Sequence, residues 1–135
     1  MLTVNSVMRE KVLIIDDNQD DVLIAVRVLS RLRSGIVTEV ASGGEEGLAL
    51  LGGENTLPSL ILLDLKMPGM SGIEVLRKIR GDQRLEGVPV VVVSHSALES
   101  DVSACREAGA TAVLHKAFDI ELFGMDIGAV LERWL

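Results

Sequence analysis

Four short apolar runs in this chain each end on a polar or charged residue. The runs and the residues that follow them are Val12–Ile15 before Asp16-Asp17, Leu60–Leu63 before Asp64, Val90–Val93 before Ser94, and Ala112–His115 before Lys116. Runs of this length, rich in β-branched residues and separated by helix-length stretches, are typical of buried parallel strands joined by crossover helices. Ligands of such open sheets bind outside the carboxyl ends of the strands. We therefore expect three carboxylates, a hydroxyl and an ammonium to gather in one crevice.

Five strand–helix units account for most of the sequence. After a loosely held tail over 1–10, we predict strands at 11–15, 36–41, 59–63, 88–93 and 112–114, and helices at 19–32, 45–51, from 71, from 96 to near 109, and from 119 to the end. Ser71 and Ser96, each followed by Glu three residues later, show the spacing of a capping box. Right-handed crossovers then give an α/β three-layer sandwich, with 11–135 as one domain and no output domain after it.

Composition argues against several functional classes. The chain has 135 residues, a net charge of −7 and only Phe118, Phe123 and Trp134 as aromatic residues, so a nucleic-acid partner is not expected. Since no apolar stretch approaches the ~20 residues of a membrane span, we expect no membrane association. A single cysteine, Cys105, excludes an internal disulfide and favours a reducing cytoplasm.

Asp16, Asp17 and Asp64 are the central site candidates. Helix capping or loop solvation explains any one of them alone. Three carboxylates at one end of a sheet repel one another unless a cation joins them, and Mg²⁺ prefers such oxygen ligands together with phosphate oxygens. Lys116 would add a point charge for a transferred group, and Ser94 would donate a hydrogen bond to a phosphoryl oxygen.

Further residues extend this set. In chain order they are Asp16-Asp17, Asp64-Leu65-Lys66-Met67-Pro68-Gly69-Met70-Ser71-Gly72, Ser94, Ala108-Gly109-Ala110 and Lys116. The set resembles the receiver domain of two-component response regulators, and the resemblance runs from about Lys11 to the end. It implies a flavodoxin-like (βα)5 fold whose parallel five-stranded sheet has the order 2-1-3-4-5.

The resemblance assigns a role to each acidic residue. Asp64 would be the phosphoacceptor, which takes a phosphoryl group from a sensor histidine kinase and forms an acyl phosphate. Mg²⁺ would be bound by Asp17, Asp64 and the backbone carbonyl of Lys66, with Asp16 acting through water.

The resemblance also assigns roles to Lys116 and Ser94. Lys116 and the metal would neutralise charge on the phosphoryl oxygens, and Ser94 would follow the phosphoryl group and draw the next loop inward. The protein would then be a signalling switch rather than an enzyme, although it would promote its own Mg²⁺-dependent phosphorylation and dephosphorylation.

Three residues depart from the family's pattern. Val113 stands where a switch aromatic is usual, and Ala117 replaces the proline that normally follows the lysine with a cis bond. A cis bond to Ala117 would cost ~2.5–4 kcal/mol, so either packing holds it or a trans bond aims Lys116 differently. His95 stands where a small residue usually leaves room for the phosphoryl group. We favour a solvent-facing loop histidine over a gate that slows access or hydrolysis.

Three other functions compete with the switch. The main alternative is a pseudo-receiver, an interaction module in which the departures at 95, 113 and 117 uncouple phosphate from output. A phosphatase of the haloacid dehalogenase type would need a second acid where Lys66 stands. A flavodoxin-type flavin module would need a Ser/Thr-rich phosphate loop in place of the acidic stretch 16–21.

The last helix suggests how such a switch would signal. It carries Ile120, Phe123, Ile127, Leu131 and Trp134 on one stripe, which we expect to face the core, and Leu122, Met125 and Ala129 on a second face. The second apolar face indicates a homodimer or partner surface shared with the preceding helix and strand. Some stand-alone receivers that work with phytochrome-type kinases resemble this chain, with Ser at the position of Ser94 and a terminal helix that closes on Trp.

Overall fold

Five parallel strands form a single sheet in the order β2-β1-β3-β4-β5, which confirms the predicted fold. The structure is a computed structural model, and it describes residues 10–53, 57–95, 99–116 and 120–135. The strands are β1 (Lys11–Ile15), β2 (Val37–Ala41), β3 (Leu60–Asp64), β4 (Val90–Ser94) and β5 (Ala112–His115).

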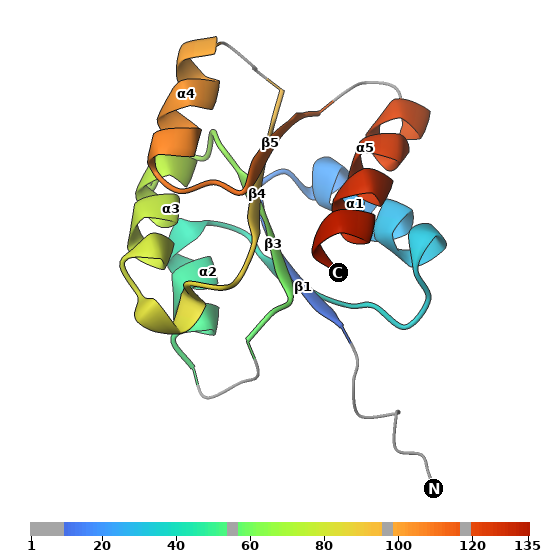
Figure 1. The fold of residues 1–135 in the computed structure, drawn as a ribbon, viewed down its shortest axis with the longest axis horizontal. Coiled ribbons are helices and arrows are strands. Elements are labelled where there is room, and N and C mark those ends of the chain that lie inside the picture. The colour runs from blue at the N-terminus through green and yellow to red at the C-terminus, as the bar shows by residue number, and fades with distance from the viewer. Residues whose placement is uncertain (1–9, 54–56, 96–98, 117–119) are drawn as a thin grey trace, which may run out of the picture.

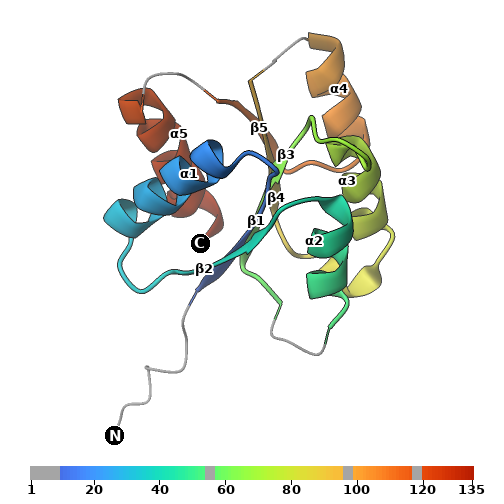
Figure 2. The same ribbon diagram turned by 180° about the vertical axis from the view of Figure 1, so that it is seen from behind.

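Helices cover both faces of the sheet and make it the middle of three layers. One face carries α1 (Gln19–Leu32) and α5 (Ile120–Trp134), and the other carries α2 (Gly44–Leu51), α3 (Gly72–Arg80) and α4 (Glu99–Glu107) (Figure 1, Figure 2). Among the described residues, no helix is long and apolar enough to cross a membrane.

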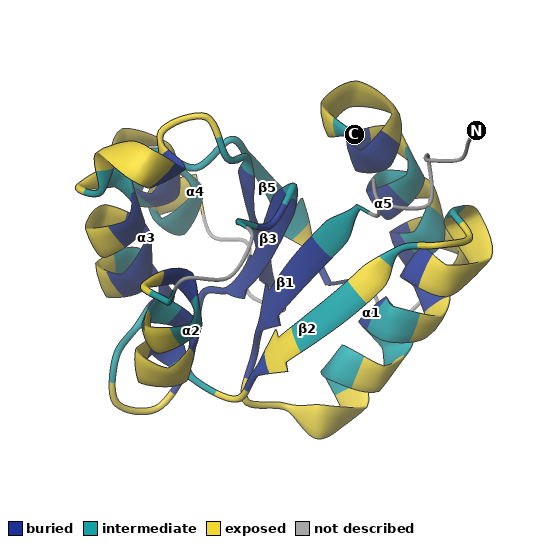
Figure 3. Cartoon of the chain, turned by 90° about the horizontal axis from the view of Figure 1, so that it is seen from below, coloured by how far each residue is buried: buried dark blue, intermediate teal, exposed yellow. Residues whose placement is uncertain are grey.

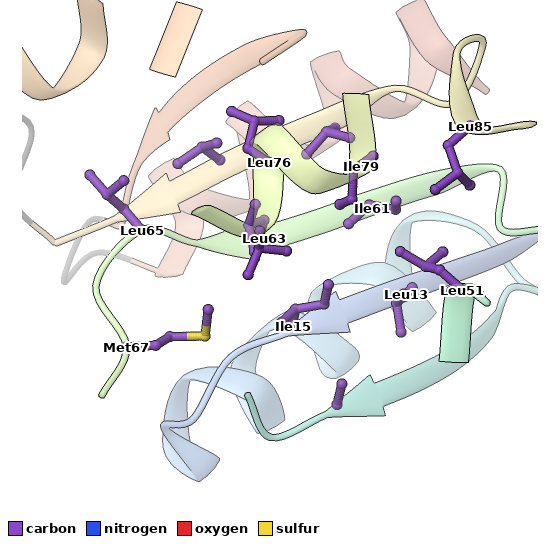
Figure 4. Close-up of a cluster of buried hydrophobic side chains, with 14 of the residues drawn as sticks. Leu13, Ile15, Leu51, Ile61, Leu63, Leu65, Met67, Leu76, Ile79 and Leu85 are labelled. Carbon is purple, nitrogen blue, oxygen red and sulfur yellow. The ribbon is translucent and has the colours of Figure 1, made fainter. Parts of the chain in front are cut away.

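Two apolar cores, one on each face of the sheet, hold the layers together. Because side chains alternate along a strand, Leu13 and Ile15 face the α2–α4 side, whereas Val12 and Ile14 face α1 and α5. The central strands β3 and β4 are buried along their whole length, which explains why they occur in the sequence as unbroken apolar runs. Figure 3 shows this for β3, which is drawn in the colour of buried residues. Figure 4 shows the larger core on the α2–α4 side.

The predicted element boundaries lie close to the observed ones. The capping box of α3 is confirmed, since the Glu74 backbone N–H donates to Ser71 Oγ (3.3 Å) and the Ser71 N–H donates to the Glu74 carboxylate (3.4 Å). The short 3-10 helix η2 (Gln83–Leu85) has no counterpart in the prediction, because a single turn shows no period. Because of this turn, β4 begins at Val90 rather than at the predicted Val88, whose N–H donates to the Leu85 carbonyl. The tail 1–9, the Ser96 cap and Ala117 lie outside the described residues.

One prediction about α5 is partly wrong. Phe123, Ile127 and Leu131 of the predicted stripe are buried, but Ile120 and Trp134 are 54% and 39% exposed. Both lie in the terminal turns of the helix. The stripe is therefore buried only at its centre.

Gly72 determines how closely α3 approaches the end of β3. A Cβ on Gly72 would lie 2.4 Å from the Asp64 carbonyl oxygen and 2.7 Å from the Leu65 Cα. The Gly72 N–H also donates to the Leu65 carbonyl (2.9 Å). Because the atoms that a Cβ would meet belong to the backbone, a larger residue at position 72 would have to displace the backbone rather than a flexible side chain. The glycine of the acidic motif thus fixes the chain just after Asp64.

We expect Gly72→Ala to lower the free energy of unfolding by ~2 kcal/mol or more, because the added methyl group overlaps backbone atoms. Gly124→Ala is the matched control: a Cβ there meets nothing within 4 Å, and alanine favours a helix by ~1 kcal/mol over glycine. Urea unfolding followed by circular dichroism measures both changes. A Gly72→Ala protein as stable as the wild type would contradict the close approach.

Candidate functional site

Acidic residues directly after β1 and at the end of β3 meet at the carboxyl edge of the sheet. One carboxylate oxygen from each of Asp16, Asp17 and Asp64 lies within 4.8 Å of the others. Asp16 and Asp64 are buried, whereas Asp17 is exposed. Three oxygen donors at this spacing fit a hard divalent cation, and their mutual repulsion favours one.

Lys116, directly after β5, links the carboxylates of this edge. Its Nζ lies 2.7 Å from Asp16 Oδ2, 3.0 Å from Asp21 Oδ2 and 3.4 Å from Asp64 Oδ1. The ammonium donates hydrogen bonds to Asp16 and Asp21, and it forms a longer ion pair with Asp64. Burial alone would lower the pKa of Lys116, but the bonds to Asp16 and Asp21 and the charge of Asp64 outweigh it and raise the pKa. Lys116 is therefore a charged, nearly inaccessible cation.

Asp64 is held in an unfavourable environment for a carboxylate. Its pKa is raised to about 6, against an ordinary value of 3.8. Burial is the largest cause and the negative charge of Asp16 adds to it, while Lys116 partly offsets both effects. The site thus keeps an ionised carboxylate at neutral pH at a cost in free energy that an added cation would reduce.

A cavity of about 250 Å³ opens in front of Asp64. Its walls carry several of the predicted site residues, and the full lining is Asp17, Asn18, Asp21, Asp64, Lys66, Ser94 and His95. Ser94 ends β4, is 2% exposed, and accepts the Lys116 backbone N–H on its carbonyl (2.8 Å). The structure therefore brings Asp17, Asp64, Lys66 and Ser94 around one cavity, with Asp16 and Lys116 packed beside Asp64.

Asp21, which the sequence analysis left without a role, belongs to the same cluster. It lies in the first turn of α1, where its backbone N–H donates to the N-cap residue Asn18 (3.1 Å). Burial alone would raise the pKa of Asp21, but hydrogen bonds from Lys116 and His95 outweigh it and hold the pKa below its usual value. Asp21 is therefore a further ionised group of the site.

His95 forms part of the cavity wall rather than simply facing solvent. Its Nε2 lies 2.9 Å from Asp21 Oδ2, while about half of its side chain, 49%, stays exposed. Its backbone carbonyl lies 2.8 Å from the Nε2 of His115 on β5. The favoured interpretation of His95 as a solvent-facing residue thus describes only half of the ring.

Val113, at the position of the usual switch aromatic, packs against the core on the α2–α4 side. It also lines a groove with Arg106 of α4 and Trp134 of α5. His95, the residue after Ser94, thus contacts β5 through the His115 ring, which lies against its backbone carbonyl. Position 113 of the same strand contributes only a small aliphatic side chain.

Comparisons with known proteins agree with this geometry. A family model described as the response regulator receiver domain matches residues 12–124. The probable methanogenesis regulatory protein FilR2 of Methanothrix harundinacea is 30% identical over 128 residues, which cover 92% of this chain and 83% of that protein.

Two solved structures share the fold over almost the whole chain. The phosphorylated cyanobacterial phytochrome response regulator RcpA has a TM-score of 0.85 and 27% identity, and 94% of each chain is covered. The Mn²⁺-bound form of the response regulator Rcp1 has a TM-score of 0.82 and 29% identity, covering 93% of this chain and 94% of that one.

The raised pKa of Asp64 predicts how stability depends on pH. Because the folded pKa of about 6 exceeds the ordinary 3.8, this group's contribution to stability is complete below pH 3.8 and is lost as pH rises through 6. Without divalent metal at pH 7, Asp64→Asn should therefore raise the melting temperature by about 5 °C, and this gain should vanish near pH 4.

Thermal unfolding across this pH range measures the effect. Asp20→Asn removes the same charge from an exposed neighbour of Asp21 and should leave the melting temperature within about 1 °C. An Asp64→Asn protein that melts at a lower temperature than the wild type at pH 7 would show that the charge of Asp64 does not destabilise the folded protein.

Proposed function

Because this chain belongs to the response regulator receiver domain family, we propose that it is a phosphorylation switch whose acceptor is Asp64. Receiver domains accept their phosphoryl group from sensor histidine kinases. The observation that carries the assignment is the position of Asp64 Oδ1, 3.4 Å from the Lys116 ammonium and at the wall of the cavity. A nucleophile and a charge that neutralises the transferred group are thus adjacent.

The mechanism follows from the charges of the site. With a pKa of about 6, the Asp64 carboxylate is mostly ionised at neutral pH and attacks phosphorus as the bond to the donor breaks. Lys116 neutralises charge on the phosphoryl oxygens, and Ser94, at the cavity wall, donates its hydroxyl hydrogen to one of them.

Mg²⁺ is the proposed cofactor. Asp17, Asp64 and the Lys66 carbonyl would hold it, with Asp16 acting through water, and the repulsion among these acids supports a cation here. When bound, Mg²⁺ neutralises negative charge on the phosphoryl group. The Mn²⁺-bound form of Rcp1 supports a divalent ion, and the choice of Mg²⁺ rests on the all-oxygen donor set.

The pseudo-receiver alternative is not favoured. The acidic cluster, the nearby lysine and the serine at the cavity wall support phosphoryl chemistry, despite the departures at His95 and Val113. We propose that the protein acts as a switch that promotes its own phosphorylation and dephosphorylation. A cytoplasmic location stays a prediction.

The proposed partners are a sensor histidine kinase and a second copy of this chain. Similarity to RcpA, a phytochrome response regulator, supports a kinase of phytochrome type. On α5, Leu122 and Met125 are 48% and 72% exposed, and Trp134 lines a groove with β5 and α4. This apolar face supports homodimerisation through α4, β5 and α5.

Phosphorylation should occur at Asp64 and require a divalent metal. We expect wild-type protein treated with acetyl phosphate and Mg²⁺ to gain one phosphoryl mass increment by intact-mass spectrometry. Asp64→Asn should gain none, and excess EDTA should lower the wild-type rate by at least about ten-fold. A phosphorylated Asp64→Asn protein would refute the assignment.

Met125 tests the dimer. If the α5 face is an interface, Met125→Glu would bury an unpaired charge in the dimer. The variant should therefore be a folded monomer that is still phosphorylated at Asp64. Leu23→Glu, at an apolar residue of α1 that is 51% exposed, is the control and should leave the mass unchanged. Light scattering with and without phosphodonor gives the mass, and a wild type that is monomeric in both conditions removes the proposal.

A further inference from the structure

We propose that Asp21 is a positioning residue that holds Lys116 back from Asp64 in the resting protein. The proposal rests on the phosphoryl chemistry proposed for Asp64. Asp21 acts through Lys116 and does not itself contact the transferred group.

The distances show a competition for one ammonium. Lys116 Nζ is closer to Asp16 Oδ2 (2.7 Å) and Asp21 Oδ2 (3.0 Å) than to Asp64 Oδ1 (3.4 Å). The ammonium donates hydrogen bonds to Asp16 and Asp21 and only forms an ion pair with Asp64, so Asp21 competes with a phosphoryl oxygen on Asp64 for the same ammonium.

Asp21 is the acceptor that gives way most readily. The Asp16 side chain is 7% exposed and makes the shorter bond, so separating it from Lys116 would leave a buried charge unpaired. The Asp21 side chain is 16% exposed, and the same Oδ2 lies 2.9 Å from His95 Nε2. Asp21 therefore retains a partner and access to water after Lys116 leaves.

The competition between Asp21 and the phosphoryl oxygens for Lys116 should affect the transfer step itself. With acetyl phosphate, an Asp64 oxygen forms a bond to phosphorus while the phosphorus–oxygen bond to acetate breaks, and acetate leaves with the electron pair. Lys116 must turn from Asp21 toward the phosphoryl oxygens during this step. In the phosphorylated protein it has already turned, so Asp21 should affect phosphorylation more than hydrolysis.

The test compares Asp21→Asn with Asp20→Asn. Both variants remove one charge from the first turn of α1, but Asp20 is exposed and is not among the residues that line the cavity. With acetyl phosphate and Mg²⁺, Asp21→Asn should be phosphorylated about five-fold faster than wild type, a change equivalent to ~1 kcal/mol. Asp20→Asn should stay within about two-fold, and the lifetime of the acyl phosphate should stay within about two-fold in both.

Two further variants show that Asp21 acts through Lys116. Asp21→Glu keeps the charge and should restore a rate close to wild type, which also controls for damage to the fold. Lys116→Ala should by itself slow phosphorylation. Adding Asp21→Asn to this variant should not increase the phosphorylation rate, because the ammonium that Asp21 restrains is absent.

Each other outcome overturns the proposal. Equal rates for Asp21→Asn and wild type would mean that Asp21 does not restrain Lys116. The same acceleration in Asp20→Asn or in the Lys116→Ala background would indicate a general charge effect, and equal acceleration of phosphorylation and hydrolysis would indicate access to the cavity. Failure of the wild type to gain a phosphoryl group would instead refute the function of Asp64, and the role of Asp21 with it.

Discussion

The Lys116 ammonium is the interaction on which the functional edge of this protein depends. It joins Asp16 after β1, Asp21 in α1 and Asp64 at the end of β3, although it follows β5 near the other end of the chain. Buried carboxylates that face one another repel, and Lys116 is the cation that the structure places among them. Removing it would leave the charges of Asp16 and Asp64 buried without this counter-charge, a situation that typically costs several kcal/mol.

The same arrangement suits the site to the phosphoryl chemistry that we propose for Asp64. Burial and Asp16 raise the pKa of Asp64 to about 6, so the carboxylate is ionised at neutral pH but poorly solvated. A poorly solvated nucleophile beside a cation is suited to accept a phosphoryl group, whose charge the same cation then neutralises. The end of β3 is held in place by the close approach of Gly72, which ties backbone geometry to chemistry.

Much of the fold was predictable because strand order and strand ends leave clear traces in the sequence. The apolar runs marked β1, β3, β4 and β5, and the residue after each run marked the site. Asp21 was not predictable in this way, because which side of α1 faces the crevice depends on how the helix packs. Ile120 and Trp134 follow the helical period of α5, but a period does not tell where the covering layer ends.

The route from Asp64 to the rest of the molecule differs from the usual pattern. Position 113 holds a valine, so this chain has no aromatic side chain there to respond to the proposed movement of Ser94. Instead, His95 lies against Asp21 with its ring and against the His115 ring with its carbonyl. A movement of the chain after Ser94 would therefore change contacts with both α1 and β5.

The central claim is that Lys116 offsets the burial and repulsion that disfavour an ionised Asp64. The most direct measurement is a carbon-13 NMR titration of the Asp64 carboxyl in metal-free protein, in the wild type and in Lys116→Met. The account predicts a midpoint near 6 in the wild type and a clearly higher one in Lys116→Met. A wild-type midpoint near the ordinary 3.8, or one that Lys116→Met leaves unchanged, would contradict it.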